Sequence, residues 1–162
     1  MARNRAGNRW SKGISGGGAL RLSRLLILGF QNEGVAASGP CDPDSPTPVP
    51  PVLVEDARIV ACGTGVEAGY GRPWVTVQRT VARRCAVGFR LGDDYDWGCH
   101  GALAVHRSSA EGCGLALVAA SYAPGYGKLL GPRPGQVRAR CSWLPGWQAG
   151  LDLGGIDGFG WT

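Results

Sequence analysis

The sequence predicts a mainly β fold, a small antiparallel sandwich or barrel, on three observations. Apolar residues occupy most odd positions from Val75 to Leu91, and a second alternation runs from Val137 to Trp143. Successive side chains of a strand point to opposite faces, so each alternation marks one buried face. Turn-forming Gly, Asp, Ser and Pro residues separate these segments from shorter apolar runs. Short strands at such spacing are typical of a small all-β domain.

The chain begins with a basic segment, which we assign to residues 1–37. Its six cations all precede the first acidic residue, Glu33; they are Arg3, Arg5, Arg9, Lys12, Arg21 and Arg24. From Glu33 onward the chain holds the other 11 of the 17 Lys and Arg against all 12 Asp and Glu, so the net charge of +5 comes from the six cations of this arm. We expect a disordered arm with one short amphipathic helix from Ala19 to Phe30, too short to be stable alone in water.

A proline-rich stretch follows at residues 38–51, where six of the 11 prolines lie. Proline fixes the backbone and removes a hydrogen-bond donor, so this stretch predicts a semi-rigid extended linker. We assign a β-rich domain to residues 52–148 and a glycine-rich tail to residues 149–162.

Within the β-rich domain, residues 75–91 predict two strands, or one long strand bent near Ala82, because Arg79 and Arg83 interrupt the apolar positions. Shorter runs predict further strands at Ala57–Cys62, Ala102–His106 and Leu115–Tyr122. No internal repeat is apparent. The alternative is a largely disordered chain with no stable fold.

Cys85, Trp97 and Cys141 occur in an order that resembles an immunoglobulin-type sandwich over residues 72–148. The match departs from that pattern at Ala139, where a tyrosine is typical. The resemblance implies a fold and no particular ligand. Six cysteines permit up to three disulfides in an exported chain, and in the cytosol they would be thiols. Cys85 and Cys141 lie on the apolar face of predicted strands and form the candidate disulfide.

Few residues indicate a catalytic, metal-binding or ligand-binding site. Asp93, Asp94, Asp96 and Trp97 form an acidic-aromatic segment, which we interpret as a solvated turn and as the candidate ligand loop of a binding domain. The Cys and His residues between Cys99 and Cys113 lack the paired spacing of a zinc site. No phosphate loop, dinucleotide fingerprint or nucleophile elbow occurs. We therefore expect no metal, no cofactor and no enzymatic activity.

The basic arm has two functional interpretations. It has the composition of a targeting segment, either a secretory signal ending near residues 35–37 or a mitochondrial presequence. Its six cations, named above, could instead contact a polyanion or an anionic membrane surface. No apolar run approaches the ~20 residues that span a bilayer.

We therefore expect a secreted or extracytoplasmic, non-enzymatic binding or interaction domain. The alternatives are a small mitochondrial protein, a protein with a polyanion-binding or nucleic-acid-binding tail, and the product of an incidental GC-rich reading frame. The last is considered because Gly, Ala, Arg, Pro and Trp, which have GC-rich codons, are abundant.

Overall fold

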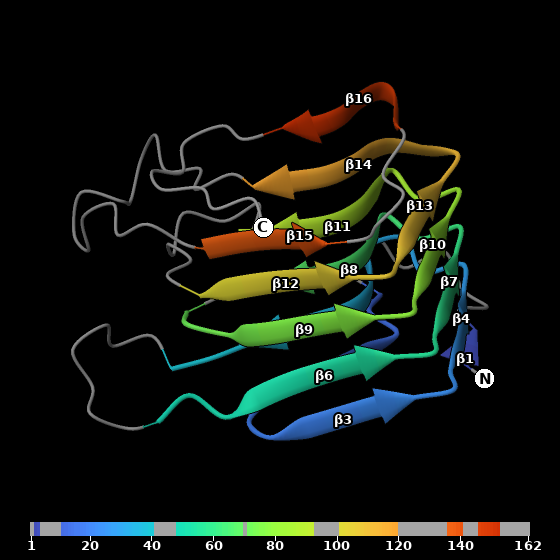
Figure 1. The fold of residues 1–162 in the computed structure, drawn as a ribbon. Helices are drawn as coiled ribbons and strands as arrows, with labels where there is room; N and C mark the ends of the chain where they lie inside the picture. Colours follow the sequence, from blue (N-terminus) through green and yellow to red (C-terminus); the bar gives the residue numbers. More distant parts are fainter. Residues whose placement is uncertain are drawn as a thin grey trace, which may run out of the picture.

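The computed structural model describes residues 2–3, 11–40, 48–69, 71–92, 101–119, 136–140 and 146–152. These segments form a parallel β-solenoid, in which the chain winds repeatedly past three sheets (Figure 1). Every strand pairing in the three sheets is parallel. No helix occurs in the described segments, and none of them could therefore cross a membrane as an apolar helix.

Sheet A, at the right of Figure 1, contains the shortest strands. Its order is β1 (Ala2–Arg3), β4 (Leu26–Leu28), β7 (Arg58–Val60), β10 (Val81–Arg83) and β13 (Ser109–Glu111).

Sheet B lies at the rear of the same view. Its order is β2 (Ile14–Gly17), β5 (Glu33–Ser38), β8 (Thr64–Ala68), β11 (Val87–Leu91), β14 (Cys113–Ala119) and β16 (Gly146–Asp152).

Sheet C lies at the front. Its order is β3 (Leu20–Ser23), β6 (Pro51–Glu55), β9 (Trp74–Gln78), β12 (Ala102–His106) and β15 (Gln136–Arg140).

Each of the first four coils visits sheets B, C and A in turn, starting at β2, β5, β8 and β11. The front strands run to the right, the rear strands run to the left and successive coils rise, so the solenoid is right-handed (Figure 1). This is the expected hand for crossovers between parallel strands. After β14 and β15 the chain returns to sheet B as β16.

The core is a set of stacked apolar side chains, each row supplied by equivalent positions of successive coils. Sheet C contributes Val52, Val75 and Leu103, and Val54, Val77 and Val105; sheet A contributes Ile27, Ile59, Ala82 and Ala110; sheet B contributes Val35, Val66, Phe89 and Leu117. A single coil cannot bury its own inward face, so stacking of coils is what creates the core.

Two corners of the solenoid are turned by single residues with left-handed backbone. At the corner from sheet C to sheet A, φ is 56° at Arg24, 52° at Asp56, 47° at Arg79 and 47° at Arg107. At the corner from sheet A to sheet B, φ is 71° at Gly29, 54° at Ala61, 53° at Arg84 and 59° at Gly112. Residues other than glycine adopt this left-handed conformation only at an energetic cost. The stacked coils therefore impose it at six non-glycine positions.

The predicted antiparallel sandwich or barrel is wrong, because all three sheets are parallel. The immunoglobulin-type topology fails for the same reason. Period-two alternation reports only that one face of a strand is buried, and it is equally compatible with parallel and antiparallel neighbours. The alternative of a largely disordered chain is also wrong for the described residues. The β-rich character is confirmed, and β12 has the bounds predicted from the sequence.

The expectation for the arm is wrong over residues 14–38, which contain β2, β3, β4 and β5 rather than disordered chain. The predicted helix from Ala19 to Phe30 is β3 and β4. Leucines three and four apart suit a helical face, but here Leu20 and Leu22 pack on the core from one side and Ile27 from the next. The proline-rich stretch lies between β5 and β6, and so it connects two sides of one coil.

The interpretation of residues 75–91 as one or two strands of a single face is also corrected. The segment contains β9, β10 and β11, which belong to sheets C, A and B. The corners at Arg79 and Arg84 reset the alternation, so that Ala82 rather than Val81 is fully buried.

Candidate functional site

The most cationic surface in the described part of the chain is sheet A with its two corners, which we call the cationic face. It carries six exposed arginines: Arg24, Arg58, Arg79, Arg83, Arg84 and Arg107. Against these, the described residues of the same face supply two carboxylates, Asp56 and Glu111. The face therefore has an excess of positive charge.

The short strands of sheet A explain why the arginines point outward. In β7 and β10 the middle residue, Ile59 or Ala82, is buried in the core, so the residues on either side face solvent. Arg58 and Arg83 occupy such flanking positions. The corner arginines are exposed because a left-handed residue at a corner turns its side chain away from the core.

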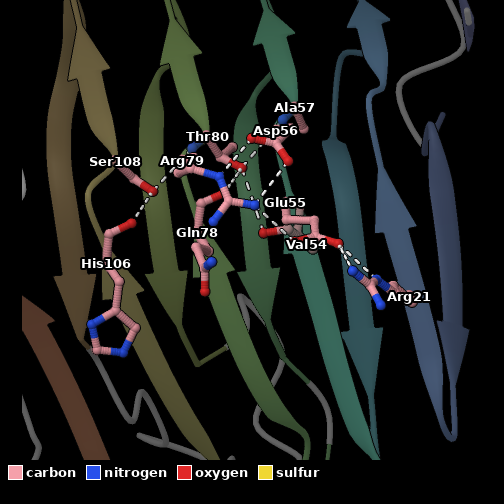
Figure 2. A network of polar contacts seen from close by, with 10 residues as sticks. All are labelled: Arg21, Val54, Glu55, Asp56, Ala57, Gln78, Arg79, Thr80, His106 and Ser108. Carbon is pink, nitrogen blue, oxygen red and sulfur yellow. Dashed lines mark hydrogen bonds and ion pairs between the residues drawn. The ribbon is translucent and has the colours of Figure 1, made fainter.

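Arg79 is held in a polar network at the corner between sheets C and A (Figure 2). Its Nε lies 2.7 Å from Asp56 Oδ1, and its Nη2 lies 2.8 Å from Asp56 Oδ2. The same Nη2 donates to Glu55 Oε2 at 2.9 Å, and Glu55 Oε1 accepts from Arg21 Nε at 2.6 Å. Glu55 is 6% exposed. This largely buried carboxylate thus bridges arginines from two coils.

The network shifts the pKa values of Asp56 and Arg79. The hydrogen bond from Arg79, opposed by desolvation and assisted by the nearby guanidinium charges, lowers the pKa of Asp56 below its usual value. The pKa of Arg79 is raised, first by its hydrogen bond to Asp56. Arg79 and Asp56 therefore stay charged, and the bidentate pair occupies the face of Arg79 that would otherwise bind a ligand.

Two buried hydroxyls stabilise the same corner from inside (Figure 2). The amide of Thr80 donates to Ser108 Oγ at 3.1 Å, and Ser108 Oγ donates to the carbonyl of His106 at 2.8 Å. One coil earlier, the amide of Ala57 donates weakly to Thr80 Oγ1 at 3.5 Å. The hydroxyl of one coil thus accepts a hydrogen bond from the corner amide of the preceding coil.

Four arginines of the cationic face have no ion pair in the described residues: Arg24, Arg58, Arg84 and Arg107. Arg83 has a long contact of 4.0 Å between Nε and Glu111 Oε2. Arg24 and Arg107 are three coils apart, which corresponds to about 14 Å at the usual strand separation. The face can therefore present several guanidinium groups to one extended anionic ligand.

Three thiols form a second notable group, the cysteine stack, inside the corner between sheets A and B. Cys62, Cys85 and Cys113 each follow a left-handed corner residue, and the equivalent position in the first described coil is Phe30. All three are free and buried. Interaction with the Cys85 thiol, opposed by burial, lowers the pKa of Cys62 and of Cys113 to about 7. The same interactions with Cys113 and Cys62 raise the pKa of Cys85.

Sequence reasoning missed the cysteine stack, although a signal for it exists. One sequence pattern occurs three times: a charged residue, any five residues, a Cys, any two residues, a Gly or Ala, and a large apolar residue. It begins at Asp56, Arg79 and Arg107 and places the cysteines at the stack positions. The spacing of the cysteines, 23 residues from 62 to 85 and 28 from 85 to 113, is irregular because the connections from sheet B to sheet C vary in length.

Several predicted site residues lie outside the described residues. These are the candidate ligand loop Asp93, Asp94, Asp96 and Trp97, the arm residues Arg5 and Arg9, and Cys141. The predicted pairing of Cys85 with Cys141 therefore stays a prediction, and in the structure Cys85 lies between Cys62 and Cys113. Within the described segments no three His, Cys, Asp or Glu residues converge as a metal site.

The remaining cations predicted to contact a polyanion are dispersed in the structure. Arg3 belongs to β1, Lys12 Nζ lies 3.3 Å from Glu33 Oε2, and Arg21 binds Glu55. Arg24 is at the corner of the cationic face. The structure therefore places two of the predicted arm cations, Arg24 and Arg3, on sheet A or its corner, where arginines from three later coils also lie.

The chain was compared with protein-family models, with curated proteins and with solved structures, and none of the three comparisons finds a match. The functional argument therefore depends on the geometry alone.

Proposed function

We propose that this protein is a non-enzymatic binding module whose cationic face binds a linear polyanion bearing phosphate or sulfate groups. The observation that carries the proposal is the set of four exposed arginines, on sheet A and at its corners, that have no ion pair within the described part of the chain. Guanidinium groups bind tetrahedral oxyanions through two parallel hydrogen bonds, with better geometry than lysine offers. The four arginines come from four successive coils, and Arg24 and Arg107 occupy equivalent corner positions, so together they spread positive charge along the face, which suits an extended ligand with several charges.

The test compares salt dependence for two probes, a fluorescent single-stranded oligonucleotide and a fluorescent heparin oligosaccharide. Four arginine contacts to single-stranded phosphates predict a slope of log affinity against log salt of about −3. The variant R58Q/R84Q/R107Q leaves one of these four arginines, and its slope should fall to roughly −1 with weaker binding throughout. The probe that binds more tightly at matched charge and salt identifies the source of the oxyanions.

The matched control is R5Q/R9Q/K12Q, which removes the same net charge from the basic arm and leaves Arg3, in strand β1 of sheet A, unchanged. It should bind both probes nearly as well as the unmodified protein. If the arm variant loses binding and the face variant does not, the polyanion site is the arm and the proposal for the face is wrong. If both variants bind equally and weakly, the affinity follows net charge and no dedicated face exists.

Export from the cytoplasm is a separate proposal, supported by the even number of cysteines and by the composition of residues 1–37, with the mitochondrion as the alternative. Removal of those residues would also remove β1, β2, β3, β4 and most of β5. The N-terminal residue and intact mass of the protein from its native host test this directly. A retained Met1 or Ala2 would show that the arm is not a cleaved leader.

A further inference from the structure

The cysteine stack repeats one side-chain geometry in three consecutive coils. Each thiol faces the carbonyl oxygen two residues earlier: Cys62 Sγ lies 3.5 Å from Val60 O, Cys85 Sγ 3.6 Å from Arg83 O and Cys113 Sγ 3.9 Å from Glu111 O.

The two upper thiols also face sheet A of the coil below. Cys85 Sγ lies 3.8 Å from Ile59 O, and Cys113 Sγ lies 3.6 Å from Ala82 O. Equivalent backbone and equivalent contacts mean that neighbouring sulfur atoms are separated by about the rise of one coil, roughly 4.8 Å.

This separation decides which chemistry fits the stack. A relaxed disulfide needs Cβ atoms about 3.5–4.5 Å apart, closer than two in-register strands place them. Zinc needs four convergent ligands, and a column of three thiols cannot surround one ion. The zinc–thiolate bond is about 2.3 Å long, and two metal–thiolate bonds of about that length on opposite sides of one ion span about 4.6 Å. The coil rise matches that arrangement.

The surroundings of the stack favour a soft ion. Cys62, Cys85 and Cys113 are 5%, 3% and 0% exposed, and they belong to the same apolar cluster as Ile59 and Ala82. The charge of Glu111 raises the pKa of Cys113, but the Glu111 side chain is exposed and is not part of the buried column. Thiolate ligands favour Cu(I), zinc and iron–sulfur clusters, and of these Cu(I) is the one that a single pair of thiolates can hold.

We propose that the cysteine stack is a two-coordinate binding site for Cu(I), held between neighbouring thiolates, with Cys85 always one of the two ligands. Binding exchanges two thiol protons for one cation: Cu⁺ and two S–H groups give a bis-thiolate complex of charge −1 and two protons released to solvent. No electron is transferred. Cys85 is shared by both pairs in the stack, so one ion is bound at a time without a bridging sulfur. This site is separate from the cationic face and does not depend on the function proposed for it.

The experiment uses the full chain carrying C41S, C99S and C141S, which leaves the stack as the source of thiols. Cu(I) is titrated anaerobically against a chromophoric Cu(I) chelator, and X-ray absorption counts the neighbours of the metal. We expect one Cu(I) per chain with two sulfur neighbours. No binding in competition with the chelator, or a coordination shell containing nitrogen or oxygen, would overturn the proposal.

Variants of the stack identify the ligands. C62A and C113A each leave one neighbouring pair and should still bind one ion. C85A leaves thiols two coils apart and should lose binding, as should C62A/C113A, which keeps Cys85 alone. Far-UV circular dichroism reports whether C85A folds, and if it does not, the C62A/C113A variant decides the question. Retention of Cu(I) by a folded C85A, or by the double variant, contradicts the assignment.

A last measurement separates metal binding from oxidation. The metal-free parent is exposed to a mild thiol oxidant, and its intact mass is measured. The spacing argument predicts no rapid loss of the two mass units that accompany a disulfide. Rapid and complete disulfide formation within the stack would show that the sulfurs approach more closely than the coil rise allows, and it would overturn the proposal.

Discussion

Replacing Ser108 with alanine tests whether buried hydroxyls stabilise the corner between sheets C and A. The amide of Thr80 lies outside the strands, and the hydrogen bond that the structure records for it ends on Ser108 Oγ at 3.1 Å. Thr80 is fully buried and Ser108 is 4% exposed, so water cannot easily replace the lost acceptor. The change removes one oxygen atom and adds no bulk.

The expected loss follows from the buried donor. An unsatisfied buried amide costs about 1–3 kcal/mol. A loss of about 2 kcal/mol corresponds to a fall in melting temperature of roughly 4–8 °C for a chain of this size. S108T keeps the hydroxyl, and threonine already occupies the equivalent corner position at Thr80. We therefore expect S108T to retain most of the stability.

The measurement is equilibrium unfolding in urea, with S109A as the matched control. Ser109 Oγ donates to Glu111 Oε1 at 3.0 Å in an exposed contact, so S109A should change the free energy of unfolding by less than about 0.5 kcal/mol. Equal midpoints and slopes for S108A and S109A would refute the reasoning, since they would show that the amide of Thr80 finds another partner.

Two further predictions follow from the packing and the charges. A Cβ at Gly88 would lie 2.6 Å from the carbonyl oxygen of Ala116, so G88A should destabilise the protein by about 1–3 kcal/mol in thermal unfolding, whereas G16A, whose Cβ meets no atom within 4 Å, should not. An equal effect of both would contradict the packing argument. The pKa of Asp56 is lowered on folding, mainly by the hydrogen bond from Arg79. Its contribution to stability is therefore present above the unfolded pKa near 4 and is lost as the pH falls through the lower folded pKa. D56N should flatten the acid limb of a plot of stability against pH, and an unchanged limb would show that this pair is not coupled to folding.

Local patterns in the sequence predicted individual strands well where the alternating segment contains no corner of the solenoid. Ala102–His106 alternates cleanly and has no corner inside it, so the predicted bounds agree with β12. The buried positions Val75 and Val77 in β9 were predicted for the same reason. Alternation is a property of a few consecutive residues and needs no knowledge of neighbouring strands.

Prediction from alternation failed at the corners of the solenoid. Arg79 and Arg84 adopt the left-handed backbone that usually signals glycine or asparagine, and an arginine gives no turn signal in a sequence. Each corner also resets which residues face the core. One apparent face from residue 75 to residue 91 was therefore three strands in three sheets.

Composition and local order in the sequence determined that the chain is rich in strands, that its cations concentrate early and that six cysteines are available. Tertiary structure decided that the strands are parallel, that Arg24 joins arginines from later coils on one face, and that three of the cysteines form a column. The physical reason is that coil stacking relates residues more than 20 positions apart, through connections of unequal length. Register between coils is set by core packing and backbone hydrogen bonds between strands, and neither is visible in a local pattern.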